Sequence, residues 1–381
     1  MIKKKIVVLI NSLGMGGAER VIVTLLNELV NDYNCYLILI ENEIYYELDD
    51  RITIIHLNEN SNSNGMIKLL RLPILSFKLS NIIKEHKFTN ILSLLTRSNY
   101  LNVLSNLFQK HETILSEHSL LSMQYANKDL KSIINKSLVH LLYKYADNII
   151  TVSKYCKYDL KVNFNVINNV HTIYNPIDIE LIRNKKNDDI DIEFKKFTFV
   201  TIGRLDEGKN HKLMIDSIKD IDANLIIIGD GILRNELEIY IDKLNLNNKI
   251  LLLGLQLNPF KYLSKSDAFI FTTNFESFGM VLLEALACDL PIISTDCLSG
   301  PREILAPNSD IKFKLKDKLE LANYGILTPI NNSNKLKEAM NLIINDENLR
   351  KNYKEKASQR VNEFSVNQIV EQYKKILGIK E

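Results

Sequence analysis

Short apolar runs alternate with segments of helical periodicity along most of the chain. Such alternation is typical of parallel β-sheets covered by helices. In the first half, the apolar runs predict strands at residues 6–13, 36–40, 52–57, 91–95, 113–116, 148–152 and 172–174. A second series predicts strands at residues 197–203, 225–228, 250–253, 268–271 and 291–294. The pattern therefore predicts two doubly wound, Rossmann-like α/β domains.

The join between the two series is a break in the pattern near residue 180. Residues 174–178 interrupt the alternation, and residues 184–191 are polar and charged. We expect an N-terminal domain over residues 1–180 and a C-terminal domain over residues 195–365. Ligands of open α/β sheets bind at the carboxyl ends of the strands, so we expect a cleft where these ends face each other. The tail over residues 346–381 is expected to be helical throughout.

Two other helical segments bear on function. Ile133, Ile134, Leu138, Leu141 and Leu142 have the spacing of one buried helix face. Residues 65–87 predict a helix that Pro73 can interrupt, and this helix is rich in basic side chains: Lys68, Arg71, Lys78, Lys84 and Lys87. A basic amphipathic segment can lie on an anionic membrane or hold a lipid pyrophosphate. The alternative is the solvated face of a core helix.

The composition excludes several classes of protein. The chain has 381 residues, 46% of them apolar and 25% charged, which is typical of a soluble globular protein with two domains. A net charge of +2 gives no case for nucleic-acid binding. The four cysteines form no C-x-x-C pair, so we expect reduced thiols. No run approaches the roughly 18 apolar residues of a membrane span. Residues 3–10 imitate a secretory signal but are too short, and they predict a buried strand.

The most informative segment is 275–287, which sets Glu276 and Glu284 on either side of a helix start. Gly279 lets a ligand approach the first turn of that helix, whose N–H groups favour an anion such as phosphate. Glu276 lies just outside the turn, and Glu284 leans back toward the same end. Such a site holds phosphate with backbone groups and sugar hydroxyls with carboxylates. The spacing alone also fits two solvated glutamates.

A second candidate segment, residues 203–211, ends the first strand of the second series. Arg204 and Lys209 flank a tight turn, with the next helix expected to begin near Asn210. Two cations at the mouth of a cleft can neutralise a departing diphosphate, Arg by bidentate contact and Lys as a point charge. The alternative is an ordinary charged strand–helix loop, but the Glu276/Glu284 helix in the same domain favours the functional interpretation.

In the first domain, residues 14–20 read Gly-Met-Gly-Gly-Ala-Glu-Arg and open the first helix. Gly16 and Gly17 allow close approach to a phosphate or sugar. A dinucleotide fingerprint is the rival, but Glu19 stands at its third glycine, and only Glu41 could serve as the ribose-binding acid. His118 ends a strand and could hydrogen-bond a sugar hydroxyl, although a lone histidine is more often structural.

Metal binding is not expected. Two D-x-D patterns occur, at residues 189–191 and 220–222, but neither follows a buried strand as in metal-dependent sugar transferases. No cluster of histidines and carboxylates suggests zinc.

Taken together, these motifs resemble the retaining glycosyltransferases of family 4, which have the GT-B fold. Residues 14–20, 203–205, 209–210, 229–231 and the Glu276/Glu284 pair occur in the family's order over nearly the whole chain. Within the family, the chain is similar to bacterial enzymes that extend undecaprenyl-diphosphate-linked glycans with N-acetylgalactosamine. Residues 97–100, 254–262 and 299–305 carry this closer likeness, and other O-antigen and capsule transferases share the last of them.

The resemblance implies roles for matching residues. Arg204 and Lys209 would bind the donor diphosphate, Glu276 the sugar hydroxyls and Glu284 the ribose. Other donor contacts would come from Gly16, Gly17, Gly203, Leu255, Phe278, Gly279 and Met280, with Leu255 near the uracil and residues 278–280 at the phosphate. His118 would lie beside the sugar. The last helix, residues 366–381, would cross back onto the first domain. Ser277 and Asp289 depart from the family, since glycine is common at both positions.

The expectation is therefore a metal-independent retaining glycosyltransferase without a cofactor. Its donor would be a UDP-N-acetylhexosamine, UDP-GalNAc in the first instance. Its acceptor would be a polyprenyl-diphosphate-linked glycan of surface polysaccharide or glycoprotein assembly, met by Lys68, Arg71 and Lys78 at the cytoplasmic face of the inner membrane. The alternatives are a UDP-sugar epimerase of the same fold, a non-catalytic nucleotide-sugar-binding assembly partner and, more remotely, a dehydrogenase.

Overall fold

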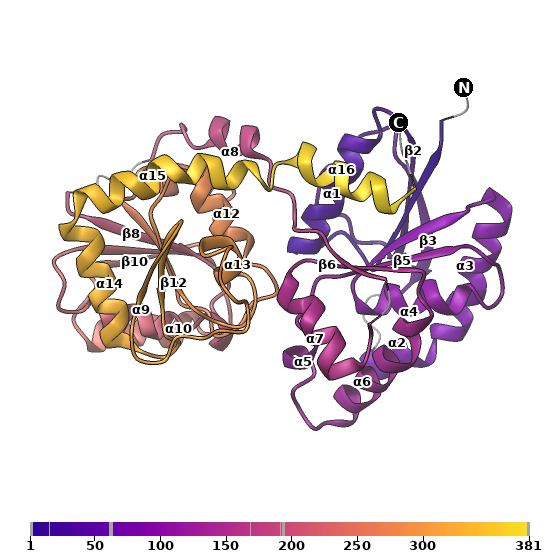
Figure 1. Ribbon diagram of the computed structural model, residues 1–381, viewed down its shortest axis with the longest axis horizontal. Helices are drawn as coiled ribbons and strands as arrows, with labels where there is room; N and C mark the ends of the chain where they lie inside the picture. The colour runs from indigo at the N-terminus through magenta and orange to yellow at the C-terminus, as the bar shows by residue number, and fades with distance from the viewer. Residues whose placement is uncertain are drawn as a thin grey trace. The chain divides into compact units, whose positions relative to one another are not determined.

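The computed structural model describes residues 3–14, 16–60, 64–167, 169–190, 192 and 195–378. The chain forms two compact units (Figure 1). Unit 1 comprises Met1–Pro176 together with Val366–Glu381, and unit 2 comprises Ile177–Ser365. The chain thus leaves unit 1 after Pro176 and returns to it for its last helix. Met15 and Asp191, which belong to two of the motifs above, lie outside the described residues.

Unit 1 is built on a parallel sheet with the strand order β3-β2-β1-β4-β5-β6-β7. Its strands are β1 Lys5–Ile10, β2 Asn34–Glu41, β3 Thr53–Glu59, β4 Asn90–Leu94, β5 Glu112–Glu117, β6 Asn148–Thr151 and β7 Val170–Thr172. Its helices are α1 Gly17–Leu29, α2 Gly65–Leu70, α3 Leu72–His86, α4 Thr96–Ser105, α5 Leu121–Gln124, α6 Leu130–Leu142, η1 Tyr143–Tyr145, α7 Lys154–Phe164 and α16 Val366–Ile376.

Alternate residues of the strands in unit 1 enter two separate apolar clusters. Val8 of β1 packs in one cluster with residues of α1 and α16. Val7 packs in the other, with residues of α3, α4, α6 and α7. This is the result expected for a strand whose successive side chains point to opposite faces of a sheet covered on both sides. The first strand is buried, as expected.

Unit 2 repeats the architecture with the strand order β10-β9-β8-β11-β12-β14-β13, in which β13 is antiparallel to β14. Its strands are β8 Thr198–Ile202, β9 Asn224–Ile228, β10 Ile250–Gly254, β11 Ala268–Phe271, β12 Ile292–Thr295, β13 Glu320–Ala322 and β14 Gly325–Thr328. Its helices are α8 Ile179–Lys185, η2 Glu207–Lys209, α9 His211–Ile218, α10 Arg234–Lys243, α11 Phe260–Ser264, α12 Met280–Ala287, α13 Pro301–Leu305, α14 Ser333–Asn345 and α15 Glu347–Asn362.

The structure corrects several predicted elements. Strands β13 and β14 were not expected, because runs of three and four residues are too short to show a period. Strand β7 begins two residues earlier than predicted, at Val170. The helical tail is two helices, α15 and α16. The predicted helix over residues 65–87 breaks at Arg71, and Pro73 lies in the first turn of α3, where its missing N–H costs nothing.

Helix α6 buries only part of the predicted face: Leu138 and Leu142 are half-buried and pack against the core cluster. Ile133 and Leu141 are 53% and 49% exposed, whereas Asn135 and Val139 are buried. Asn135 faces α4, where the Tyr100 hydroxyl donates to its main-chain oxygen at 3.1 Å. The apolar spacing of α6 therefore faces partly outward. No described helix is long and apolar enough to span a membrane.

Candidate active site

Four loops of unit 2 gather at the carboxyl end of its sheet, after β8, β9, β11 and β12. The first two pack backbone against backbone: a Cβ atom on Gly229 would overlap the carbonyl oxygen of Gly203, and one on Gly231 would overlap that of Leu205. Glycine at these positions therefore lets the loop after β9 support the loop that carries Arg204.

Lys209 and Glu276 form an ion pair at this edge of the sheet. Their side chains are 25% and 15% exposed, so both reach solvent. The short helix η2 holds Lys209 in place, since Asp206 accepts the N–H of Lys209 at 3.2 Å. The Thr272 hydroxyl donates to the carbonyl oxygen of Lys209 at 3.0 Å, which ties η2 to the end of β11. Lys209 in η2 and Glu276 in the loop after β11 are both predicted site residues, and the fold brings them together.

Arg204 projects into solvent, with 77% of its side chain exposed. Its Nε donates to Asp206 at 2.5 Å. Partial burial acts to raise the pKa of Asp206, but the hydrogen bond and charge of Arg204 and the N–H of Lys209 outweigh it and lower that pKa. Asp206 therefore stays ionised and steadies both candidate cations.

Helix α12 begins where the sequence predicted. Gly279 has a φ of +94°, a conformation that side chains rarely adopt, and it caps the helix without a side-chain hydrogen bond. Glu284 lies in the second turn and is 4% exposed. Phe278 is buried against Phe364, with ring centroids 5.7 Å apart. Asp289 ends the α12 segment at a φ of +58°, so the aspartate adopts the left-handed conformation expected of it.

A pocket of about 400 Å³ lies among these loops. It is lined by Arg204, Asp206, Glu207, Gly208, Lys209, Ile232, Thr273, Phe275, Glu276 and Ser277. Two cations and three carboxylates line this pocket, so it offers charged partners for an anionic group and acceptors for neutral hydroxyls. A larger hollow, of about 800 Å³, is lined by α14, α15 and the turn between them and takes no residue from the strand ends. We therefore assign the smaller pocket as the candidate site.

Some expected donor contacts lie outside the lining of this pocket. Leu255 follows β10 and is 72% exposed. Gly203, Phe278, Gly279, Met280 and Glu284 belong to the same sheet edge but are not among the lining residues. Sequence reasoning in turn missed Asp206, Ile232 and Phe275. Ile232 is 88% exposed at the pocket, and such an exposed apolar residue after a strand has no distinguishing signal in the sequence.

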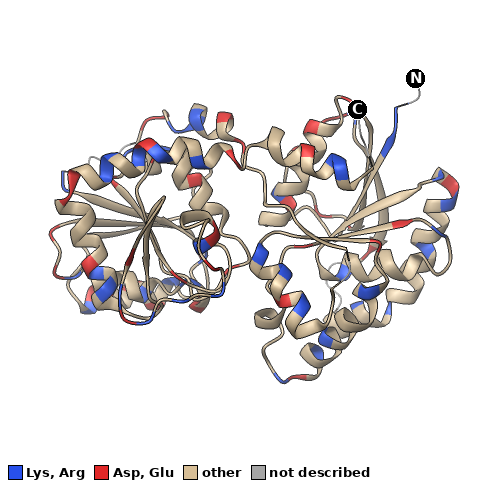
Figure 2. Cartoon of the chain, in the orientation of Figure 1, with Lys and Arg blue, Asp and Glu red and all other residues tan. Residues whose placement is uncertain are grey.

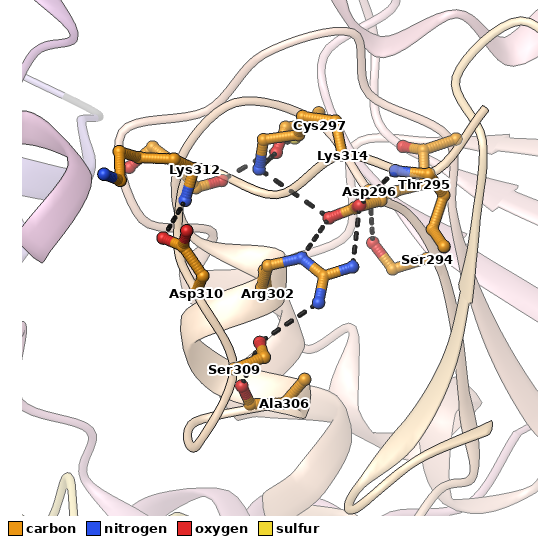
Figure 3. A network of polar contacts seen from close by, with 12 residues as sticks. Ser294, Thr295, Asp296, Cys297, Arg302, Ala306, Ser309, Asp310, Lys312 and Lys314 are labelled. Atoms are coloured by element: carbon orange, nitrogen blue, oxygen red, sulfur yellow. Dashed lines mark hydrogen bonds and ion pairs between the residues drawn. The ribbon is translucent and has the colours of Figure 1, made fainter. Parts of the chain in front are cut away.

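The loop after β12 is anchored by a buried network of charges (Figure 3). The guanidinium of Arg302, 2% exposed, makes two parallel contacts with Asp296 at 2.9 and 2.8 Å. Asp296 also accepts the N–H of Leu315 at 2.8 Å, and Ser309 contacts Arg302 at 3.0 Å. The irregular segment between α13 and β13 is thereby tied to the end of β12.

In unit 1, His118 follows β5 at the carboxyl end of the sheet. Its Nε2 lies 2.9 Å from the Ser116 hydroxyl. Burial lowers the pKa of His118 to about 4, so the imidazole is neutral at physiological pH and can exchange hydrogen bonds but carries no charge. The neighbouring Glu117 was not predicted as a site residue. Burial raises its pKa to about 7, although Tyr143 donates to it at 2.5 Å.

Gly16 and Gly17 lie at the start of α1, beyond the carboxyl end of β1. A Cβ atom on Gly16 would overlap the side chain of Glu19, whereas the space beside Gly17 is open. Glu41, the candidate ribose-binding acid of a dinucleotide site, is paired with Lys68 at 2.6 Å, which argues against that alternative.

The three basic residues expected at the acceptor or membrane lie on α2, on α3 and at the junction between these helices. Lys68 is partly buried in its pair with Glu41, whereas Arg71 and Lys78 are exposed. In Figure 2, Lys and Arg positions are coloured blue on α3 and α6. Exposed apolar residues accompany them: Leu70, Ile74, Phe77, Phe108 and Ile133. Among the described residues, no group of three or more His, Cys, Asp or Glu side chains is arranged to hold a metal ion.

Comparison with known proteins decides the family. Residues 15–181 match the model of Glycosyltransferase Family 4, and residues 182–360 match that of Glycosyl transferases group 1. The chain is 35% identical over 367 residues to a protein of Campylobacter jejuni, covering 95% of this chain and 96% of that one. That relative is N-acetylgalactosamine-N,N'-diacetylbacillosaminyl-diphospho-undecaprenol 4-alpha-N-acetylgalactosaminyltransferase.

The chain belongs to glycosyltransferase family 4.

A second Campylobacter jejuni relative of this glycosyltransferase is 27% identical, with 98% of each chain covered. Its name is GalNAc-alpha-(1->4)-GalNAc-alpha-(1->3)-diNAcBac-PP-undecaprenol alpha-1,4-N-acetyl-D-galactosaminyltransferase. Solved structures confirm the GT-B fold. Sucrose-phosphate synthase from Thermosynechococcus elongatus superposes with a TM-score of 0.81 at 16% identity, covering 99% of this chain and 100% of that one. Anabaena HepE in complex with UDP and glucose gives 0.76 at 19% identity, with 99% of each chain covered.

Proposed function

We propose that this glycosyltransferase moves an N-acetylhexosamine, GalNAc in the first instance, from a UDP-sugar to an undecaprenyl-diphosphate-linked glycan. The observation that carries the proposal is the pocket of unit 2, where Lys209, Arg204 and Glu276 meet beside the start of α12. The names of the two Campylobacter relatives support the sugar and the lipid carrier. The UDP complex of the Anabaena structure supports the nucleotide.

In this proposal the donor binds unit 2. The diphosphate takes the N–H groups at the start of α12 and the charges of Arg204 and Lys209, while Glu284 accepts from the ribose and the backbone near Leu255 meets the uracil. Glu276 accepts hydroxyls of the transferred sugar. Lys209 already contacts Glu276, so a donor bound here can place its phosphate against Lys209 and its sugar against Glu276.

Transfer with retention follows from the family resemblance. The acceptor hydroxyl attacks the anomeric carbon from the face that UDP leaves, and a phosphate oxygen of the donor takes its proton. Arg204, Lys209 and the N–H groups at the start of α12 stabilise the negative charge that develops on the leaving diphosphate. His118, being neutral, can offer a hydrogen bond to a sugar hydroxyl, and the open space beside Gly17 leaves the start of α1 accessible to a ligand. The reaction requires no divalent metal in this scheme.

The deciding experiment is a UDP-release assay over a panel of UDP-sugars, with and without a synthetic polyprenyl-diphosphate-linked HexNAc, in EDTA. We expect release that depends on the acceptor and is greatest with UDP-GalNAc. Isomerisation of UDP-GlcNAc without acceptor would instead indicate an epimerase. UDP binding without turnover on any donor would indicate a non-catalytic partner. A requirement for added Mg²⁺ or Mn²⁺ would contradict the metal-independent scheme.

We also propose that unit 1 lies on the cytoplasmic face of an anionic membrane through the exposed surface of α2 and α3. Leu70, Ile74 and Phe77 are 74%, 63% and 55% exposed on these helices. Arg71 and Lys78 accompany them, which is the composition of an interfacial surface. Replacing Ile74 and Phe77 by Ser should reduce sedimentation with anionic vesicles, and high salt should do the same to the parent. Unchanged sedimentation of the variant would contradict this surface.

A further inference from the structure

We propose that Arg97 is a positioning residue, which holds α2 against the sheet of unit 1 and thereby sets how tightly the acceptor binds. This inference rests on the proposed function, because α2 and the residue that follows it supply Lys68 and Arg71, two of the cations assigned to the acceptor. Arg97 belongs to segment 97–100, one of the three segments that carry the likeness to GalNAc-transferring enzymes. The structure supplies its positioning role from three contacts.

The guanidinium of Arg97 joins three separate parts of unit 1. Arg97 is the second residue of α4, directly beyond β4. Its Nη2 pairs with Glu59, the last residue of β3, and donates to the carbonyl oxygen of Lys68 at 3.3 Å. Its Nη1 lies 3.5 Å from Glu41, the last residue of β2. One planar group therefore connects two strand ends with the backbone of α2.

A second ion pair completes the cluster. Lys68 on α2 contacts Glu41 at 2.6 Å, so two cations balance two carboxylates. The side chains of Glu59, Glu41, Arg97 and Lys68 are 2%, 9%, 12% and 19% exposed. Ion pairs this little exposed are weakly screened by solvent and salt, and removing one member leaves an uncompensated charge.

Among the described residues, few apolar contacts hold helix α2. It has six residues, all of them described, and none is buried. Leu69 packs partly against the core, but Ile67 and Leu70 are 44% and 74% exposed. A helix this short does not persist without tertiary contacts. The contacts of α2 with Arg97 and Glu41 are thus the polar ties that fix its place on the sheet.

Arginine suits this position better than lysine. A guanidinium presents several N–H donors in a rigid plane, whereas an ammonium is a single point of charge. Lysine at residue 97 would keep the charge and lose the simultaneous contacts to Glu59, Glu41 and Lys68. Glu59 Oε1 and Arg97 Nε are buried and have no hydrogen-bond partner among the described residues. These two atoms therefore offer no substitute hydrogen bond if the ion pair breaks.

The consequence for the reaction should be confined to the acceptor. The candidate donor pocket is lined by residues of unit 2, and the Arg97 cluster lies in unit 1. Loosening α2 displaces Lys68 and Arg71 from the acceptor diphosphate but leaves the pocket intact. A displacement of about 1 Å can cost on the order of 100-fold in rate when it moves a group that positions the substrate.

The first arm of the test measures α2 itself, by amide hydrogen exchange of residues 65–71 in Arg97→Lys and Glu59→Gln. We expect exchange to accelerate about 10-fold or more in α2, while α3 keeps its parental protection. Arg51→Lys is the matched control, because Arg51 pairs with Asp49 at 2.7 Å and is 56% exposed. Unchanged exchange in α2 would overturn the proposal, whatever the activity of the variants.

The second arm measures kinetics with UDP-GalNAc and the polyprenyl-diphosphate-linked acceptor. In Arg97→Lys we expect kcat/KM for the acceptor to fall about 10- to 100-fold, with the donor KM and the affinity for UDP unchanged. Equal changes in both KM values would overturn the proposal. A lower kcat/KM for the acceptor with unchanged exchange in α2 would show that Arg97 touches the acceptor directly. A parent enzyme without transfer would refute the proposed function, and the exchange arm would still decide whether Arg97 holds α2.

Discussion

At the scale of single residues, the candidate site depends on Lys209, whose charge is shared between a carboxylate and the expected diphosphate. Lys209 reaches Glu276 across 67 positions of sequence. Its main chain is fixed by Asp206 and Thr272, so its ammonium group starts from a defined place. Preorganised charge of this kind contributes most when negative charge develops on the leaving group.

We therefore expect Lys209→Ala to lower turnover about 100- to 1,000-fold, equivalent to about 3–4 kcal/mol of transition-state stabilisation. The assay is UDP release with saturating acceptor. Lys212→Ala is the matched control on the adjoining helix, since Lys212 is 47% exposed and pairs with Glu236. Turnover of Lys209→Ala within a few-fold of the parent would exclude a role for this cation in the reaction.

A second residue-scale prediction concerns His211, which lies beneath the loop of Arg204 and Lys209. Burial lowers the pKa of His211 from 6.5 to about 4, while Asp206 opposes the shift and Lys209 adds to it. In the unfolded chain His211 is protonated as the pH falls through about 6.5, whereas in the folded protein it is protonated only near pH 4. The stability contributed by the neutral imidazole is present above this window and is lost as the pH falls through it.

Replacing His211 by Asn should make the free energy of unfolding less dependent on pH. The difference in slope between parent and variant is at most one proton, or about 1.4 kcal/mol per pH unit. Urea unfolding of unit 2 at a series of pH values between about 4.5 and 7 measures it. Identical slopes for parent and variant would show that His211 titrates normally in the folded protein.

At the scale of elements, the strand-end loops of unit 2 are positioned by buried contacts rather than by their own conformational preferences. The segment between α13 and β13 is the clearest case, because Arg302 and Asp296 hold it over the end of β12. Arg302 belongs to segment 299–305, which carries part of the family likeness. The structural role of Arg302 is the bidentate pair, which joins residues six positions apart in the chain.

Arg302→Leu should destabilise unit 2 by about 3–5 kcal/mol, because Asp296 would remain buried without its bidentate partner. Denaturant unfolding gives the magnitude. The double variant Arg302→Leu with Asp296→Asn removes both charges and should recover part of the loss. If the single variant loses less than about 1 kcal/mol, the pair contributes no more than a surface salt bridge.

Helix α6 shows where local pattern was a poor guide. Its apolar spacing correctly predicted a helix, which the structure gives over Leu130–Leu142, but Ile133 and Leu141 face outward. Asn135 is buried instead, and its oxygens accept the hydroxyl of Tyr100. A buried hydroxyl without a partner is costly, so a polar contact between helices can outweigh the exposure of two apolar side chains.

At the scale of the whole molecule, the return of the chain to unit 1 makes the last helix part of the first folding unit. Ile369, Val370 and Tyr373 of α16 enter the apolar cluster that also contains residues of α1. Unit 1 is therefore completed only when the C-terminal segment has been made.

A chain that ends at Ser365 should lose stability in unit 1 and keep it in unit 2. Each large apolar side chain withdrawn from the core costs about 1.5–3 kcal/mol, and α16 buries several. Hydrogen exchange resolved by peptide should show faster exchange in β1 and α1, with β8 and β9 unchanged. A chain that ends at Gly378 serves as the control. Parental exchange throughout unit 1 would mean that α16 is dispensable to its fold.

The sequence was enough to predict the two α/β series, most strand positions, the start of α12 at Gly279 and the resemblance to a family. These features are local: a period of apolar residues, a glycine or a charge beside a strand end. It could not show that Lys209 meets Glu276, that Arg97 ties α2 to the sheet, or which face α6 buries. Those contacts join residues far apart in the chain, and the competition between burying apolar groups and satisfying polar ones decides them only after the elements pack.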